Sequence, residues 1–319
     1  HYKCQYTGNA FHDRALSRWF MDPVSHVDNE SMLNQQPENV SRAAAWLLLG
    51  VLGGLGLDLA AKELLETYSL VQFILLRSGI AIGILLAIAP RFGGYVALTT
   101  RRAGWHLLRA VFAIGAMFGF FYGLANMPLV NAFTLGYTAP LIVTALSALF
   151  LGDKVGLRRW SAVIIGFGGV LIMLRPGSGE FSFAAIAVLF AAFCYACQAI
   201  TARHLGESES TMSLLFYVVV GPFLVSTAII ETGDWTSPDT IGWILIVTAA
   251  ICSVIAWVGF VNGYRAVSPA TLAPLEYVAL VGGAIAGYVF WDELPDVWVV
   301  LGALVIVGSG IFVVRRGAR

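Results

Sequence analysis

Ten long apolar stretches, separated by short polar segments, follow one another along the chain from residue 43 onward. A bilayer core requires about 20 apolar residues in a helix, and each stretch has about that length. No polar segment after residue 42 is long enough to fold as a separate domain. The pattern therefore predicts ten membrane-spanning helices, which we expect at 43–60, 69–89, 103–124, 128–150, 157–174, 182–202, 211–230, 241–262, 270–290 and 296–314.

The second five stretches repeat landmarks of the first five at an offset of 140 residues. Gly119-Phe120-x-x-Gly123 returns as Gly259-Phe260-x-x-Gly263, and Tyr137 returns as Tyr277. Because each half has an odd number of spans, the second copy must cross the bilayer in the opposite sense, an arrangement typical of secondary transporters. The expected fold is therefore an all-α membrane protein with ten transmembrane helices in two inverted five-helix repeats.

Composition supports the membrane assignment. Of the 319 residues, 58% are apolar and 12% are charged, and the mean hydropathy is +0.80. Soluble domains carry about 25% charged residues, so half of the usual charge is missing. We expect a disordered cytoplasmic tail at 1–42, a first repeat at 43–174 and a second repeat at 182–314.

The basic residues predict the orientation, since cytoplasmic loops concentrate lysine and arginine. With the N-terminus inside, eleven basic residues fall on the cytoplasmic side after residue 42, and only Lys62 and Arg175 fall outside. We therefore expect a multi-pass protein of the bacterial inner membrane with both termini in the cytoplasm.

Patterns typical of catalysis are missing from the sequence. It contains no G-x-x-x-x-G-K-[ST] motif and no cluster of histidines or acids at metal-ligand spacing. Cys194 and Cys197 form a C-x-x-C, but it lies inside an apolar stretch, where membrane packing is the expected role. We expect no metal, no cofactor, no nucleic-acid partner and no enzymatic activity, with a membrane-embedded enzyme as the alternative class. The expected partners are a small-molecule substrate and membrane lipids, and proton coupling and a homodimer are left open.

Four charged residues lie clearly inside the apolar stretches: Asp58, Arg77, Arg109 and Glu276. An ionisable group in hydrocarbon costs at least about 2.5 to 3.5 kcal/mol unless it faces protein or water. Each is therefore a candidate for substrate binding, with a structural ion pair as the alternative. Counted from the ends of the predicted spans, Asp58 and Arg77 lie towards the outer side of the membrane. Arg109 and Glu276 fall towards the cytoplasmic side, and Glu276 is the best candidate because nearby Pro274 frees backbone groups to face a cavity.

Tyr137 and Tyr277 occupy matching positions, each close to a proline that weakens its helix. Transporters built from inverted repeats place their binding site where two such helices meet near the middle of the membrane. Further candidates for the lining, with packing as the alternative for each, are Asn131, Gln198 and Trp257. Together these residues indicate a cavity that stacks a flat or hydrophobic metabolite and bonds its edges.

Two segments carry a resemblance to a known family, AFTLGYTAPLIVTALSALFLGDKVGLRRWSAVIIGFGGVLIMLRP at 132–176 and SPATLAPLEYVALVGGAIAGYVFWDELPDVWVVLGALVIVGSG at 268–310. They resemble the two EamA repeats of the drug/metabolite transporter superfamily, which also tends to place arginines where Arg77 and Arg109 stand. The Asp58-x-x-x-Lys62 pattern is similarly common in its bacterial uptake carriers. The resemblance implies ten helices in two inverted repeats, cytoplasmic termini, and a central cavity formed largely by spans one, three, four, six, eight and nine.

The predicted ninth span, with A-P-x-x-Y followed by E-x-P-D, resembles the branch that imports riboflavin or S-adenosylmethionine. We favour riboflavin uptake because a neutral isoalloxazine suits an aromatic cavity without a cluster of acids. A cationic sulfonium would prefer more than one intramembrane carboxylate beyond the outer Asp58. The alternatives are S-adenosylmethionine uptake and export of an amino acid or a drug.

Overall fold

The computed structural model describes residues 37–91, 93–150, 156–175, 182–205, 209–266 and 275–317. Within these ranges the chain forms a helical bundle without any strand. The main helices are α2 (Pro37–Thr67), α3 (Leu70–Ile88), α4 (Ala103–Asn126), α5 (Leu129–Gly136), α6 (Ala139–Phe150), α7 (Leu157–Leu174), α8 (Phe183–Leu205), α9 (Thr211–Ile229), α10 (Thr240–Ala266), α12 (Val278–Trp291) and α13 (Val297–Gly317).

Eight helical segments in the described part are long and apolar enough to cross a membrane, with α5 and α6 together forming one of them. The apolar parts of α12 and α13 are shorter. The structure thus confirms an all-helical protein with several membrane spans. The number ten stays a prediction, because the expected span at 270–290 begins outside the described residues.

The first helix is longer than predicted. α2 has 31 residues and extends beyond the expected 43–60 at both ends. At 1.5 Å per residue it is about 46 Å long, so it exceeds the hydrocarbon thickness of about 30 Å. The rest of the expected tail, 1–36, and Pro274 lie outside the described residues.

The helix expected at 128–150 is broken in its middle. α5 ends at Gly136, and α6 begins three residues later. Pro140 has no backbone N–H to donate to the carbonyl of Gly136, so the helical hydrogen-bond ladder is interrupted. Next to this interruption, the hydroxyl of Thr138 donates to the carbonyl of Leu135 at 2.6 Å. The Thr138 hydroxyl is therefore hydrogen-bonded within the break, inside an apolar bundle.

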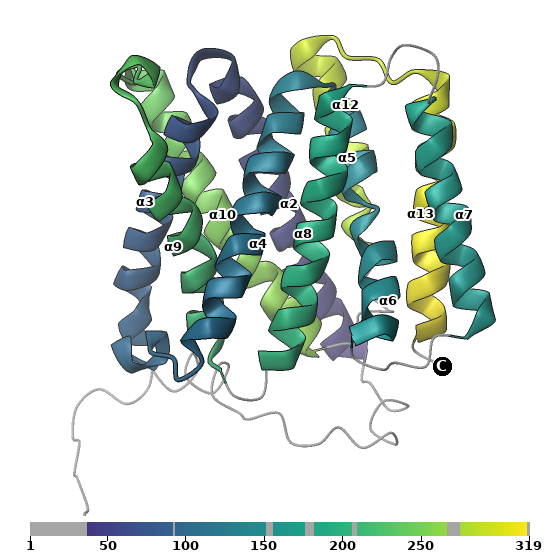
Figure 1. The fold of residues 1–319 in the computed structure, drawn as a ribbon, viewed down its shortest axis with the longest axis horizontal. Coiled ribbons are helices and arrows are strands. Elements are labelled where there is room, and N and C mark those ends of the chain that lie inside the picture. The colour runs from purple at the N-terminus through teal and green to yellow at the C-terminus, as the bar shows by residue number, and fades with distance from the viewer. Residues whose placement is uncertain are drawn as a thin grey trace, which may run out of the picture.

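The two repeats pack against each other in exchanged pairs. α2 packs along α10 and α4 along α8, so the first helix of each repeat lies on the third helix of the other. α3 packs on α9, and α7 on α13. In Figure 1, α3 and α9 lie at one side of the bundle and α7 and α13 at the other, and α2 begins at the end where α13 finishes. The pairing of a first with a third helix thus occurs twice, and the second and fifth helices each pack on the equivalent helix of the other repeat. This pattern is expected for an inverted repeat.

Glycines of the duplicated pattern make the closest of these contacts possible. Gly259 of α10 lies on the backbone of Gly50 and Trp46 in α2, and Gly119 of α4 lies on the carbonyl of Ala187 in α8. A side chain at either glycine would collide with the backbone of the facing helix. The Gly-Phe-x-x-Gly pattern therefore holds the first helix of one repeat against the third helix of the other.

Candidate substrate-binding cavity

A cavity of about 320 Å³ lies between helices of both repeats. Its walls come from α2, α4, α5, α6, α8, α10 and the segment around the start of α12. These correspond to the six spans that the family resemblance implied. The volume is within the range of about 300 to 1,000 Å³ that is usual for small-molecule sites. Small apolar residues, aromatic rings and two carboxyl groups form the lining.

The two carboxyl groups come from different repeats. Asp58 of α2 and Glu276, in the helical turn before α12, both line the cavity. Arg77 of α3 is only 3% exposed and acts electrostatically on Asp58. Its Nη2 also donates to Sδ of Met117 at 2.8 Å. Because α2 continues for nine residues beyond Asp58, this carboxyl lies farther from the helix end than predicted, in the same space as Glu276.

Two tyrosines at matching positions meet beside the cavity. The ring centroids of Tyr137 and Tyr277 are 5.0 Å apart with planes inclined by 44°. Both residues lie at helix ends with nearly the same backbone, φ −68° and ψ 2° against φ −67° and ψ −8°. The Tyr137 hydroxyl donates to the backbone carbonyl of Glu276 at 2.6 Å. Tyr137 lines the cavity, whereas the hydroxyl of Tyr277 lies against Gly310 of α13.

The other predicted candidates lie outside this lining. Arg109 is 5% exposed, and its Nη1 donates to the carbonyl of Leu214 in α9 at 3.2 Å. Gln198 is buried in α8, and Asn131 and Trp257 are partly buried in α5 and α10. Among the described residues that form the cavity wall, none of these four is found. Their contact with a substrate stays a prediction, and Arg109 has a structural partner.

Comparison with known proteins shows which family has this arrangement. The model of the EamA-like transporter family matches residues 41–175 and 182–315, which together make up most of the chain. The chain belongs to the EamA-like transporter family. The resemblance of its two repeats to EamA repeats is thereby confirmed. The protein is a multi-pass membrane transporter for a small molecule, and its family and relatives are transporters rather than enzymes.

Relatives with assigned names match most of this EamA-family chain. The riboflavin transporter of Vibrio cholerae is 29% identical over 286 residues, 86% of this chain and 93% of the relative. The S-adenosylmethionine uptake transporter of Rickettsia bellii is 26% identical over 285 residues, 88% and 96% of the two chains. The pseudopaline exporter of Pseudomonas aeruginosa is 27% identical over 256 residues, 80% and 89%. One crystal structure matches with a TM-score of 0.60 at 19% identity over 85% of this chain and 95% of that chain, which supports the fold alone.

Sequence reasoning missed four aromatic residues that line the cavity of the EamA-family protein: Phe120, Phe133, Tyr195 and Phe260. Phe120 and Phe260 each follow the first glycine of the duplicated pattern. The motif that brings the helices together thus also presents a phenylalanine ring to the cavity. The 140-residue repeat is the sequence signal that identifies Phe120 and Phe260. Phe120 stacks on Phe133 with centroids 6.3 Å apart and planes inclined by 9°. Nothing in the sequence distinguishes Phe133 or Tyr195 from the many other aromatic residues.

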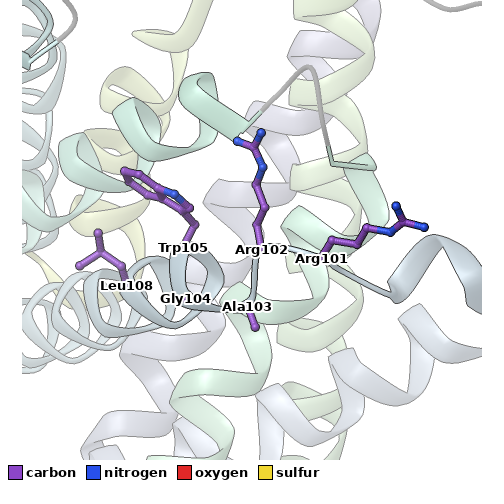
Figure 2. A pocket seen from close by; sticks show the side chains of 6 residues that line it. All are labelled: Arg101, Arg102, Ala103, Gly104, Trp105 and Leu108. Atoms are coloured by element: carbon purple, nitrogen blue, oxygen red, sulfur yellow. The ribbon is translucent and has the colours of Figure 1, made fainter.

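A wide, open hollow at the start of α4 has a different character. Its volume is about 640 Å³, and its lining includes Arg101, Arg102, Trp105 and Leu108. Figure 2 shows the guanidinium groups of the two arginines pointing in different directions, with Trp105 and Leu108 on the first turns of the helix. Arginine and tryptophan together are typical of the membrane–water interface. The hollow therefore marks one end of this span and is separate from the cavity between the repeats.

Proposed function

We propose that this EamA-family protein is a secondary transporter that takes up a cofactor-sized aromatic metabolite, riboflavin first, across the bacterial inner membrane. The observation that carries the proposal is the aromatic cavity between the repeats with its two carboxyl groups, Asp58 and Glu276. The Vibrio cholerae relative, named a riboflavin transporter and matched over 93% of its length, supports the substrate. Ten spans with both termini in the cytoplasm belong to the same proposal and rest on the distribution of basic residues.

The chemistry of the lining suits a neutral ring system. The positive charge of Arg77 acts electrostatically on Asp58. Riboflavin carries an uncharged, flat isoalloxazine whose faces stack on rings such as Phe120 and Phe133. Its polar edge needs hydrogen-bond partners, which Glu276 and Tyr137 supply at one part of the wall. A carboxyl in such a cavity can also take up a proton on one side of the membrane and release it on the other, which couples uptake to a proton gradient.

S-adenosylmethionine is the second candidate, and one observation favours it. Asp58 and Glu276 face the same space among five aromatic rings, counting Tyr137 with the four phenylalanine and tyrosine residues described above. Organic cations bind between carboxylates and aromatic faces, with about 0.5 to 2 kcal/mol for each cation–π contact. The Rickettsia bellii relative is named an S-adenosylmethionine uptake transporter. The sequence predicted Asp58 and Glu276 at different depths, whereas the structure places both in one cavity, as a cationic sulfonium would require.

Uptake by the purified full chain in proteoliposomes tests both substrates. We expect saturable uptake of radiolabelled riboflavin that rises with an inward proton gradient and is competed by unlabelled riboflavin but not by S-adenosylmethionine. The reverse preference assigns the second substrate. Linear, unsaturable flux contradicts a carrier. Efflux from preloaded vesicles under the same gradient measures direction, and faster efflux than uptake contradicts an importer and matches the activity named for the pseudopaline exporter.

Glu276→Gln tests the role of the carboxyl. Glutamine has nearly the same shape but cannot exchange a proton at neutral pH. We expect kcat/KM for uptake to fall by about 10-fold or more, about 1.4 kcal/mol, together with the stimulation by the gradient. The control is Glu63→Gln on the exposed side of α2, which should keep both properties. Unchanged uptake with an unchanged pH profile would remove Glu276 from the mechanism.

A further inference from the structure

A largely buried ion pair joins the two repeats at the end of the bundle opposite to the start of α2. Nζ of Lys62 in α2 lies 2.6 Å from Oε1 of Glu293 in the α12–α13 connection, and Lys62 is 7% exposed. Nζ also donates to the carbonyl of Met127 at 3.1 Å, and Oε2 of Glu293 accepts from the backbone N–H of Leu129 at 2.8 Å. One ion pair thus ties together α2, the α4–α5 connection and the α12–α13 connection.

This ion pair lies between the central cavity and a second hollow, of about 350 Å³, at the same end of the bundle. On α2, Asp58 lines the cavity and Lys62, one turn later, lines the hollow. On α4, Phe120 likewise lines the cavity, and Leu124, one turn later, lines the hollow. One turn rises about 5.4 Å, so a single layer of side chains separates the two spaces along both helices.

A third helix, α5, shows the same one-turn spacing between the cavity and this end of the bundle. Phe133 of α5 lines the cavity, and Leu129, one turn nearer to the end of the bundle, is the residue whose N–H bonds Glu293. The hollow beyond the ion pair is lined by Trp291, whose ring centroid is 5.4 Å from Nζ of Lys62 and whose Nε1 donates to Glu66 at 3.0 Å. The ion pair therefore belongs to the layer of side chains between the cavity and the hollow.

We infer that the Lys62–Glu293 ion pair is the outer gate of the transport path, closed in this structure, and that the hollow lined by Glu66 and Trp291 is the vestibule in front of it. The inference rests on the proposed function for its direction, since this end is the outer one when the termini are cytoplasmic. Alternating access moves parts of one repeat against the other around a fixed site. Lys62 belongs to the first repeat and Glu293 to the second, so this movement separates the two charges.

Burial makes the pair suitable as a gate. The side chains of Lys62 and Glu293 are 8% and 20% exposed. Two charges largely removed from water are stable only while they stay paired and hydrogen-bonded, so the closed arrangement is preferred over a partly opened one. A neighbouring ion pair lacks these properties. Arg175 and Asp296 lie 2.7 Å apart on the α7 and α13 side, but their side chains are 32% and 45% exposed and line neither space. This exposed pair provides a matched control.

Accessibility of the cavity from outside tests the gate. In a chain whose four cysteines are replaced by alanine, Ala116→Cys places one thiol in the cavity wall. A membrane-impermeant thiol reagent added to intact cells should label it slowly. We expect labelling about 10-fold faster or more with Lys62→Met or Glu293→Gln, since either change removes the charge pairing of the closed state. Lys62→Arg, which keeps the charge, and Asp296→Asn should both stay near the slow rate.

Several outcomes would overturn the gate. One is equal labelling rates in all variants. Another is an acceleration by Asp296→Asn as large as that by Glu293→Gln, which would indicate general loosening. A third is acceleration seen only in inside-out vesicles, which would place the barrier on the cytoplasmic side. If the single variants misfold by gel filtration, the double variant Lys62→Met, Glu293→Gln removes both charges, and slow labelling of its folded form also counts against the gate.

The labelling experiment needs no substrate. Absence of riboflavin uptake with accelerated labelling would reject the proposed substrate and keep the gate. Saturable uptake with unchanged labelling would do the opposite. The two proposals therefore fail in distinguishable ways.

Discussion

At the scale of single residues, Glu209 shows how a charge is held where the chain leaves the apolar bundle, between α8 and α9. Its side chain is 5% exposed and lies 3.3 Å from Nε2 of His106. The hydroxyls of Thr100 and Ser213 donate to it at 2.7 Å and 3.2 Å. Burial alone would raise the pKa of Glu209, but Thr100, His106 and Ser213 outweigh this effect and hold its pKa below the ordinary value.

Glu209→Gln should therefore destabilise the protein in a pH-dependent way. A carboxyl with a depressed pKa contributes stability above its unfolded pKa of about 4.3, and that contribution is lost as pH falls through the lower folded value. We expect a loss on the order of 1 kcal/mol at neutral pH, which shrinks below about pH 4. Melting in detergent at both pH values measures it, with exposed Glu231→Gln as control. A loss of the same size at both pH values contradicts the charge argument.

At the scale of helices, the α2–α10 contact depends on backbone lying directly on backbone. A Cβ at Gly259 would come closer than 3.0 Å to atoms of Gly50 and Trp46. These are main-chain atoms, which cannot move aside as a flexible side chain can. Gly308 of α13 stands in open space instead, with no atom within 4 Å of a Cβ. Glycines in this protein thus differ sharply in what a methyl group would meet.

Gly259→Ala and Gly308→Ala form a matched pair of substitutions. Because the first forces two packed helices apart, we expect a loss of about 1 to 3 kcal/mol and a lower melting temperature in detergent. The second should be neutral or slightly stabilising, since alanine has the better helix propensity by up to about 1 kcal/mol. Equal effects of the two changes would show that close helix contact is not what Gly259 provides.

At the scale of the whole molecule, the exchanged pairing of helices puts the cavity between the repeats. Asp58, Phe120 and Tyr137 of the first repeat line it together with Phe260 and Glu276 of the second. Any rocking of one repeat against the other must therefore change access to this space. The proposed direction of access depends on the orientation of the whole bundle in the membrane.

Reporter fusions measure that orientation. With cytoplasmic termini, a fluorescent protein fused after Arg319 should fluoresce, and alkaline phosphatase fused there should be inactive, since that enzyme matures only outside the cytoplasm. The phosphatase inserted at exposed Gly233, between α9 and α10, should be active. The opposite pattern at both positions would invert the proposed topology and would make the Lys62–Glu293 pair an inner barrier.

The sequence by itself determined the helical segments, the duplication and the family. Apolar runs of bilayer length can only be helices in lipid, because every backbone group must be bonded internally. It also selected Asp58, Glu276 and Tyr137 as candidates, and all three line the cavity. An ionisable group in an apolar stretch is costly, and a tyrosine repeated at a fixed offset is visible without coordinates. The apolar run at 128–150 predicts one continuous helix, and the break between α5 and α6 follows from Pro140 within it.

Only the tertiary structure decided which of these side chains meet. A helix whose lipid-facing and core-facing sides are both apolar gives no periodic signal for its rotation, so depth could be predicted but facing could not. Arg109 therefore bonds to the carbonyl of Leu214 and does not line the cavity, whereas Phe133 and Tyr195 line it without any signal in the sequence. Lys62 and Glu293 meet across 231 positions of chain. Such contacts depend on how the two repeats pack, because packing between apolar helices is set by close fit and not by the hydrophobic pattern.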